Sequence, residues 1–508
     1  MRSRHLPARL TLPALLIILG AAVFGSTLAI AQRGRDYDFF DPIIDIKSFI
    51  SARYVQAPDD DALQLGAIRG MLEALDDPYT FYVPAAETRE FRKEVLGEYV
   101  GIGVYVVQRD GWLTVVSPLD GSPAIAAGVM ADDRIVEING APTRGRSPDE
   151  CVELLVGKPG EDVTLTIERR GQRLPITITR QLIQTQTVKG WRRTGAGRDW
   201  DFILDPEASI ACIRITQFNA TTIDELNEAL AAAGAEAPGF GGLILDVRSN
   251  PGGLLDQAEA VADRFLDSGV IYAVEGRAHD RRIVRARSGG TLGDFPLLVL
   301  IDGGSASGSE LLAGALVEND RAIALGSRTF GKGSVQGVFE VPGQQGAQLK
   351  LTEAVYLLPS GRSIHRWPDS TVWGVDPTDG FYLPVSDEQR IEIFRMRQED
   401  EVIRAEGELP REEALARALG DPQLAAALDA MRNRIATGAW QPVTEGGETA
   451  TDALAEELRR AEARRDTLVA ELTRVSEEID RLARLAQQAD QAGAEPPAEP
   501  EPAGAGAP

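Results

Sequence analysis

Two short apolar segments most strongly constrain the fold of this chain. Residues 243–247 are apolar except for Asp246, and residues 297–301 are apolar throughout. Each is followed by a turn rich in glycine and serine and then by a helical pattern. Strands that are apolar on both faces are typical of parallel sheets covered by helices. We therefore predict a mixed α/β domain over residues 185–384.

Two smaller modules are predicted before this domain, since 508 residues suffice for about three domains of roughly 100 to 200 residues each. Residues 36–96 carry apolar side chains at helical spacing, among them Ile43 and Ile46, and predict a helical module. Residues 97–182 change to short strands, one of them predicted at 101–107. Ser147, Pro148 and Glu150 begin the single helix with a capping box, and Cys151, Leu154 and Leu155 should face its core.

The sequence after residue 384 predicts helices and then a disordered tail. Residues 385–447 form a charged helical extension, residues 448–490 a candidate coiled coil, and residues 491–508 a disordered tail of mostly alanine, glycine, proline and glutamate. A heptad pattern predicts self-association of the coiled coil; the alternative is a long solvated helix packed on its own chain. The heptad positions are Leu454, Leu458, Ala461, Leu468, Leu472, Val475, Ile479, Leu482 and Ala486.

The first 31 residues predict an export signal. Arg2, Arg4 and Arg9 precede an uncharged apolar run that ends in Ala29-Ile30-Ala31, a pattern that suits cleavage after Ala31. The run is also close to the length of a membrane helix, so an uncleaved N-terminal anchor is the alternative. In either case the rest of the chain is expected outside the cytoplasm, in the periplasm or cell envelope.

Composition excludes several classes of function. The net charge of −24 argues against nucleic acid as a partner. Cys151 and Cys212 are too few for a disulfide framework or a cysteine-rich metal site, and we expect neither metal nor cofactor. Outside the leader only His279 and His365 remain, so a histidine-based catalytic triad is poorly supplied.

A serine and a lysine stand in two turns that the fold should bring together. Ser307 follows the strand 297–301, and Lys332 follows the apolar run 322–325. If these strands are parallel neighbours, both turns lie at the same carboxyl edge of the sheet, where catalytic groups collect. Ser307 can then act as a nucleophile with Lys332 as its base.

Such a mechanism needs a neutral lysine and donors for the oxyanion. The reference pKa of lysine, about 10.4, would have to fall to roughly 7 or 8, and Phe330, Val335 and Val338 supply apolar surface for this. Gln336 could orient the amine without adding charge. The N–H of Gly308 and that of Gly252 or Gly253 could stabilise the oxyanion.

Other interpretations of these motifs exist. Ser307 with Glu310 is also a capping box, which would make the serine a helix cap. The spacing of Gly326, Gly331 and Lys332 nearly matches a phosphate-binding P-loop. Against the P-loop, position 333 is glycine in place of serine or threonine, and residues 335–341 alternate like a strand where a helix is required.

The motifs resemble those of the C-terminal processing proteases, the tail-specific serine endopeptidases. The resemblance extends over about residues 36–384. It rests on five matches. They are Gly303-Gly304-Ser305-Ala306-Ser307-Gly308-Ser309-Glu310, Arg328-Thr329-Phe330-Gly331-Lys332-Gly333-Ser334-Val335-Gln336, Asp246-Val247-Arg248-Ser249-Asn250-Pro251-Gly252-Gly253, and residues 70–79 and 358–364. It implies Ser307 as nucleophile, Lys332 as general base, Gln336 as its partner, and Ser305 and Ser309 as supporting residues.

The family resemblance also implies a PDZ domain at residues 97–182. Gly101, Ile102, Gly103 and Val104 resemble its carboxylate-binding loop and the strand after it. The chain is thus expected to be a multidomain α/β and β protein that binds exposed protein C-termini and cleaves near them. The alternative is a catalytically inactive PDZ scaffold of the cell envelope that recruits partners through its coiled coil. His365 falls where the sequence departs from the family; we expect it at the surface, and the alternative is a residue of the substrate groove.

Overall fold

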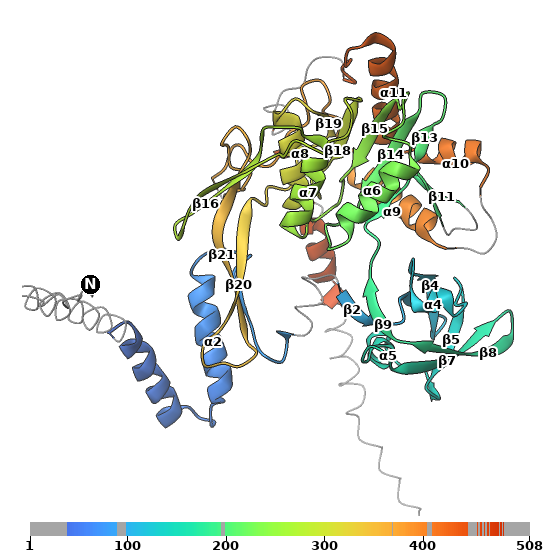
Figure 1. The fold of residues 1–508 in the computed structure, drawn as a ribbon. Helices are drawn as coiled ribbons and strands as arrows, with labels where there is room; N and C mark the ends of the chain where they lie inside the picture. The colour runs from blue at the N-terminus through green and yellow to red at the C-terminus, as the bar shows by residue number, and fades with distance from the viewer. Residues whose placement is uncertain are drawn as a thin grey trace, which may run out of the picture. The chain divides into compact units, whose positions relative to one another are not determined.

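The structure is a computed structural model. It describes residues 38–88, 98–194, 199–367, 369–403 and 409–444, and individual positions between 455 and 481. The chain divides into two compact units, one of residues 1–88 with 336–352 and the other of residues 89–335 with 353–508 (Figure 1). The predicted leader, residues 1–31, and the predicted tail lie outside the described residues.

The first unit contains the predicted helices and a strand that was not predicted. A helix covers residues 38–53, and α2 (Asp60–Glu73) begins at Asp59, whose side chain accepts two backbone N–H groups. The additional strand is β1 (Phe81–Val83), which pairs with the start of β21 (Gln348–Leu357); β20 (Ser334–Glu340) also pairs with β21. The apolar side chains of the first helix, including Ile46, are largely exposed.

Residues 98–184 form a small β-domain within the second unit. Its main sheet has the order β3-β4-β5-β7-β8, and its core is closed by α5, which begins with the predicted capping box and buries Cys151 and Leu155. The prediction of one strand at 101–107 was wrong, because residues 102 and 103 separate two strands, β2 and β3. The elements are β2 (Glu98–Gly101), β3 (Val104–Arg109), β4 (Trp112–Pro118), α4 (Pro123–Ala126), β5 (Arg134–Ile138), β6 (Ala141–Pro142), α5 (Pro148–Leu155), β7 (Asp162–Arg169), β8 (Gln172–Thr179) and β9 (Gln181–Gln184).

The α/β domain is built on the predicted parallel sheet. Its strands follow the order β10-β14-β15-β18-β19, with β13 paired to β14. The four parallel strands are β14 (Ile210–Ile215), β15 (Gly242–Asp246), β18 (Leu297–Ile301) and β19 (Ile323–Gly326). The remaining strands of the domain are β10 (Val188–Lys189), β11 (Arg192–Thr194), β12 (Asp199–Asp201), β13 (Ile203–Asp205), β16 (Val270–Gly276) and β17 (His279–Arg285).

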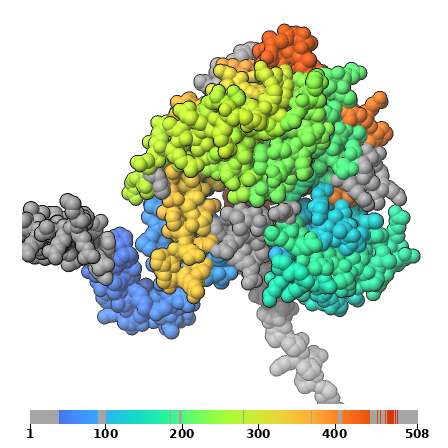
Figure 2. Space-filling view, viewed as in Figure 1, coloured from blue at the N-terminus to red at the C-terminus, as the bar shows by residue number. Residues whose placement is uncertain are grey.

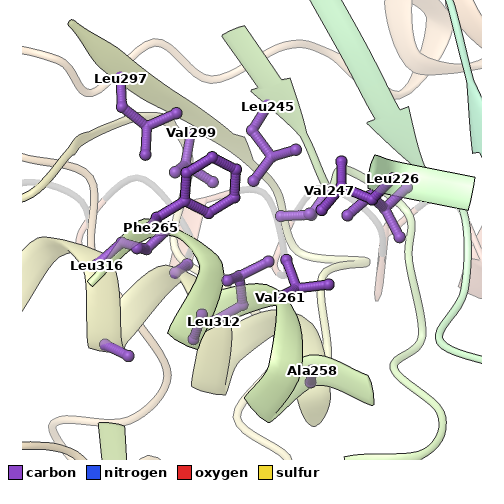
Figure 3. Close-up of a cluster of buried hydrophobic side chains, with 14 of the residues drawn as sticks. Leu226, Leu245, Val247, Ala258, Val261, Phe265, Leu297, Val299, Leu312 and Leu316 are labelled. Carbon is purple, nitrogen blue, oxygen red and sulfur yellow. The ribbon is translucent and has the colours of Figure 1, made fainter. Parts of the chain in front are cut away.

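Alternate residues of these strands enter two separate cores. Leu243 and Leu245 pack under α6 (Thr222–Ala232), α7 (Leu255–Phe265) and α8 (Gly308–Glu318), whereas Ile244 faces α10 (Arg411–Ala418) and α11 (Pro422–Thr437). Figure 3 shows the first core, with Phe265 of α7 directed toward Leu297 and Val299 of β18. Strands that are covered on both faces explain why their sequences are almost wholly apolar.

The helical extension is a layer of this domain and not a separate appendage. Ala427, Leu428 and Met431 of α11 are buried against the sheet. In the space-filling view, orange residues of this C-terminal region adjoin the green and yellow-green surface of the α/β domain (Figure 2). The sheet therefore needs residues beyond 384 to cover its second face.

Buried charges fix the extension to the end of β15. The Arg248 guanidinium bonds to Asp246, to Asp421 at the start of α11 and to Gln423, at 2.7 to 3.0 Å. Arg397 of α9 (Asp387–Glu401) reaches Asp246 at 2.7 Å. Burial alone would raise the pKa of Asp246, but Arg248 and Arg397 outweigh it and hold that pKa far below its ordinary range.

The candidate coiled coil is only partly described. The described positions between 455 and 481 are helical, and the side chains of Leu458, Leu472 and Ile479 are more than half exposed. Self-association through this segment stays a prediction. In the part of the chain that the structure describes, no helix combines the length and apolarity needed to cross a membrane.

We predict that Asp421→Ala strongly destabilises the α/β domain. The change leaves the buried Arg248 without one of its two carboxylates and removes the cap of α11, and breaking such a buried pair costs about 3–5 kcal/mol. Urea denaturation followed by tryptophan fluorescence measures this loss. Asp429→Ala, at an exposed position of α11, is the matched control and should change stability by less than about 0.5 kcal/mol. Equal stability of the two variants would contradict the assignment.

Candidate active site

Ser307 lies at a strained turn between a strand and a helix. Strand β18 ends at Ile301, α8 begins at Gly308, and Ser307 between them has φ 55° and ψ −113°. A non-glycine residue rarely adopts a positive φ, and such strain persists only where the surroundings enforce it. A sharp strand-to-helix turn of this kind presents a serine hydroxyl at the carboxyl edge of a sheet.

The neighbouring serines hold this turn against the one that follows β15. The Ser305 hydroxyl donates to the carbonyl oxygen of Val247 at 2.8 Å, and the Ser309 hydroxyl donates to that of Asn250 at 3.0 Å. The Ala306 N–H also donates to the Asn250 carbonyl oxygen, at 2.9 Å. Ser305 and Ser309 are fully buried, so their hydroxyls serve the structure of the turn.

Gly252 brings the turn after β15 directly against Ser307. Its φ is +100°, and a Cβ atom at this position would lie 2.7 Å from the Ser307 Cβ and 3.0 Å from the Gly308 nitrogen. Only glycine permits so close an approach with this backbone conformation. The Gly252 N–H already donates to the Asn250 side chain at 2.8 Å, whereas Gly308 is the first residue of α8 and its N–H has no acceptor within the helix.

A third turn, after β19, carries Lys332 to the same edge. Strands β18 and β19 pair in parallel up to Ile301 and Gly326, as predicted. The Phe330 N–H donates to the carbonyl oxygen of Ser305 at 3.0 Å, which joins the two turns. Strand β20 begins at Ser334, so a strand and not a helix follows Lys332. The P-loop interpretation is therefore wrong.

One buried carboxylate connects the turns of Ser307 and Lys332. Glu310 Oε2 accepts the backbone N–H groups of Ser307 and Lys332, each at 2.8 Å, so these two nitrogens are at most twice that distance apart. Its Oε1 accepts the Gly331 N–H at 2.7 Å and the Thr329 hydroxyl at 2.6 Å. Burial raises the pKa of the Glu310 carboxyl, and these hydrogen bonds oppose the rise.

Sequence reasoning recognised Glu310 only as a capping residue. The capping bond from the Ser307 N–H is present, but it is one of four bonds to the carboxylate. A signal was available in the sequence: Glu310 is a lone charged residue at the start of a helix whose next six residues are Leu, Leu, Ala, Gly, Ala and Leu. A charged side chain in such a buried helix requires partners.

Three expectations around the site need revision or stay open. Phe330 and Val338 are 48% and 46% exposed, so they supply less apolar cover than predicted. Gln336 belongs to the first unit, where its amide donates to Thr352 at 3.2 Å, and its role stays a prediction.

The expectation of a surface histidine was wrong, because His365 is buried and its ring packs edge to face on Trp367, with ring centroids 4.2 Å apart.

The predicted peptide-binding loop adjoins an exposed strand edge. Strand β3 is the last strand of its sheet, and its Tyr105 side chain is 58% exposed. Ile102 is buried in the domain core. Gly103 has φ +74°, and a Cβ atom added there would lie 2.4 Å from the Ser122 Cβ. An edge strand beside such a loop is the arrangement by which PDZ domains bind an extended peptide.

Within the described residues, no group of three or more His, Cys, Asp or Glu side chains is arranged to hold a metal ion. Cys151 and Cys212 are both free and buried, as expected for small apolar residues. Burial raises the pKa of the Cys212 thiol to about 12, so this side chain is not a thiolate at neutral pH.

Comparison with known proteins identifies the family. Family models match residues 209–379 as Peptidase family S41, residues 114–169 as a PDZ domain, and residues 32–88 as the N-terminal domain of the activating protease CtpB. The carboxy-terminal-processing protease of Bartonella bacilliformis is 39% identical over 325 residues, which are 63% of this chain and 71% of that protein. The chain belongs to the carboxy-terminal processing protease family.

Two further proteins are similar to this chain. Carboxy-terminal processing protease CtpA of Bacillus subtilis is 35% identical over 64% of this chain and 67% of that protein. The solved structure of the photosystem II D1 C-terminal processing protease covers 66% of this chain and 85% of that chain, with 28% identity and a TM-score of 0.39. Membership in the carboxy-terminal processing proteases makes the chain a serine-type peptidase and confirms the predicted fold class and family resemblance.

For this carboxy-terminal processing protease we predict that Gly252→Ala lowers activity about 100-fold. The new methyl group would lie 2.7 Å from the Ser307 Cβ, which is too close, so Ser307 must move. Cleavage of an unfolded protein measures the effect. Gly239→Ala is the matched control, since Gly239 also has a positive φ, +90°, but no atom lies within 4 Å of the added methyl group. Equal losses in the two variants would mean that backbone strain alone, and not contact with Ser307, sets the effect.

Proposed function

We propose that this protein is a serine endopeptidase that binds exposed protein C-termini through its PDZ domain and cleaves near them with a Ser307–Lys332 dyad. The observation that carries the proposal is the pair of 2.8 Å hydrogen bonds from the Ser307 and Lys332 N–H groups to one oxygen of Glu310. Its relatives are named carboxy-terminal processing proteases, and we propose the same position of cleavage for this protein.

The proposed mechanism is acyl transfer. The neutral Lys332 amine takes the hydroxyl proton of Ser307, and the serine oxygen attacks the peptide carbonyl carbon. The N–H groups of Gly308 and Gly253 stabilise the oxyanion; Gly252 provides close approach, because its own N–H donates to Asn250. Lys332 then returns the proton to the leaving amine. Water releases the acyl group with the help of the same base, and Gln336 orients the lysine.

Recognition is proposed to reside in residues 97–182. Gly101, Ile102, Gly103 and Val104 would bind the terminal carboxylate through backbone N–H groups, while the free edge of β3 adds the peptide as a strand. The substrate would therefore be an unfolded or extended protein end, because a folded terminus cannot pair with a strand edge.

The wider organisation is part of the proposal. The N-terminal segment, residues 1–31, would export the protein to the periplasm or cell envelope, either as a cleaved signal or as an anchor. The heptad segment, residues 454–486, would associate copies of the chain. Ser307 and Lys332 are both present, and no observation favours the inactive scaffold.

We predict that Ser307→Ala and Lys332→Ala each abolish cleavage of an unfolded protein with an apolar C-terminus. Each change removes a group that the acyl transfer requires. Intact mass spectrometry in the presence of a chelator detects the loss of C-terminal fragments and excludes contaminating metalloproteases. Ser360→Ala and Lys158→Ala alter exposed residues and should cleave like the wild type. Full activity of Ser307→Ala would reject the assigned nucleophile.

We also predict that amidation of the substrate C-terminus raises KM about tenfold or more. A carboxamide loses the charge-assisted hydrogen bonds of the carboxylate, which contribute about 1.5–3 kcal/mol. Two peptides of the same sequence, one with a free carboxylate and one with a carboxamide, give the comparison. Acetylation of the N-terminus is the control and should leave KM unchanged. Equal KM values for the carboxylate and carboxamide peptides would contradict recognition of the chain end.

A further inference from the structure

Glu310 is a fully buried carboxylate whose hydrogen-bond partners are three backbone N–H groups and one hydroxyl. The donors come from two separate turns: Ser307 follows β18, whereas Thr329, Gly331 and Lys332 follow β19. Buried carboxylates are costly unless they are fully hydrogen-bonded, and this one is placed where the two turns meet.

We propose that Glu310 is a positioning residue that sets the separation and orientation of the nucleophile and the base. The inference rests on the proposed Ser307–Lys332 dyad. Glu310 would not touch the substrate; it would act on the backbone of the two residues that do. Its side chain accepts the backbone N–H of each member of the dyad, and it joins their turns together with the bond between Phe330 and Ser305.

The chemistry of the side chain fits this role. An ionised carboxylate is an acceptor only, with about four lone-pair directions, and four donors point at Glu310. A glutamine of the same shape would direct an NH2 group at donors on one side. The four distances, 2.6 to 2.8 Å, are those of charge-assisted hydrogen bonds, which are the stronger kind.

The bond to Ser307 also acts on the strained backbone. Rotation of Ser307 away from φ 55° would carry its N–H away from Glu310, so the bond opposes relaxation of the turn. The same oxygen accepts the Lys332 N–H, so a shift of either turn is felt by the other. Positioning of a nucleophile and base at this level affects the rate of the chemical step more than substrate binding.

Glu225 provides a matched control elsewhere in the same unit. Its carboxylate also accepts four bonds, from the Thr187 and Val188 N–H groups and from the Thr187 and Thr221 hydroxyls, at 2.6 to 3.1 Å. None of these donors belongs to the turns that carry Ser307 and Lys332. A change from glutamate to glutamine therefore disturbs a similar set of bonds at both positions, and only one of the two sets holds the proposed dyad.

The experiment compares kcat and KM of the full-length chain in wild-type, Glu310→Gln, Glu225→Gln and Ser307→Ala forms, with the free-carboxylate peptide as substrate. We expect Glu310→Gln to lower kcat about 100-fold, because the dyad is misplaced. KM should change little, because the variant still binds the peptide through its PDZ domain. Glu225→Gln should lower the unfolding temperature as much as Glu310→Gln does, but it should keep the wild-type kcat.

The outcomes separate this inference from the proposed dyad. Activity of Ser307→Ala would overturn the dyad itself. An inactive Ser307→Ala together with a folded Glu310→Gln of wild-type kcat would overturn the role of Glu310 alone. Equal losses of kcat in Glu310→Gln and Glu225→Gln would also overturn it, since they would reflect a general loss of structure.

A second pair of variants decides the matter if Glu310→Gln does not fold. Thr329→Val removes one donor to Glu310, and Thr329→Ser keeps the hydroxyl. The Thr329 hydroxyl also accepts the Val375 N–H at 2.7 Å, so Thr329→Val removes both bonds and Thr329→Ser keeps both. We expect Thr329→Val to lower kcat about tenfold and Thr329→Ser to restore it, since the bond to the charged group is lost and regained. Wild-type kcat in a folded Thr329→Val protein would overturn the proposal.

Discussion

The parallel pairing of β15, β18 and β19 is the constraint on which the rest of the structure depends. Because the three strands run in the same direction, their carboxyl ends meet at one edge of the sheet. The turn with Gly252 follows β15, Ser307 follows β18 and Lys332 follows β19. Residues separated by up to 80 positions are thus brought to one edge of the sheet.

Buried carboxylates reinforce this edge in two different ways. Asp246 and Asp421 pair with Arg248 and Arg397, and these pairs join the end of β15 to helices of the C-terminal extension. Glu310 instead accepts neutral backbone and hydroxyl groups. Both arrangements satisfy a charge that would be costly if left unpaired, and both join segments that are distant in the sequence.

The two activities proposed for the protein use different physical resources. Peptide-bond cleavage needs a rigid set of groups, and the sheet edge supplies it through strain at Ser307 and close contact at Gly252. Recognition of a chain end needs an unpaired strand, which β3 offers at the edge of its own sheet. A carboxy-terminal processing protease combines both in one polypeptide.

The sequence by itself determined the local elements and the family. Apolar runs followed by glycine and serine turns predicted β15 and β18. The capping box at Ser147 predicted α5, and alternation after Lys332 predicted β20. These elements could be predicted because each pattern lies within about ten residues of the sequence. The tertiary structure decided that residues beyond 384 cover the second face of the sheet, that β1 pairs with β21, and that His365 is buried. It also decided the role of Glu310: its donors lie 3, 19, 21 and 22 positions away, and only folding brings them to one carboxylate.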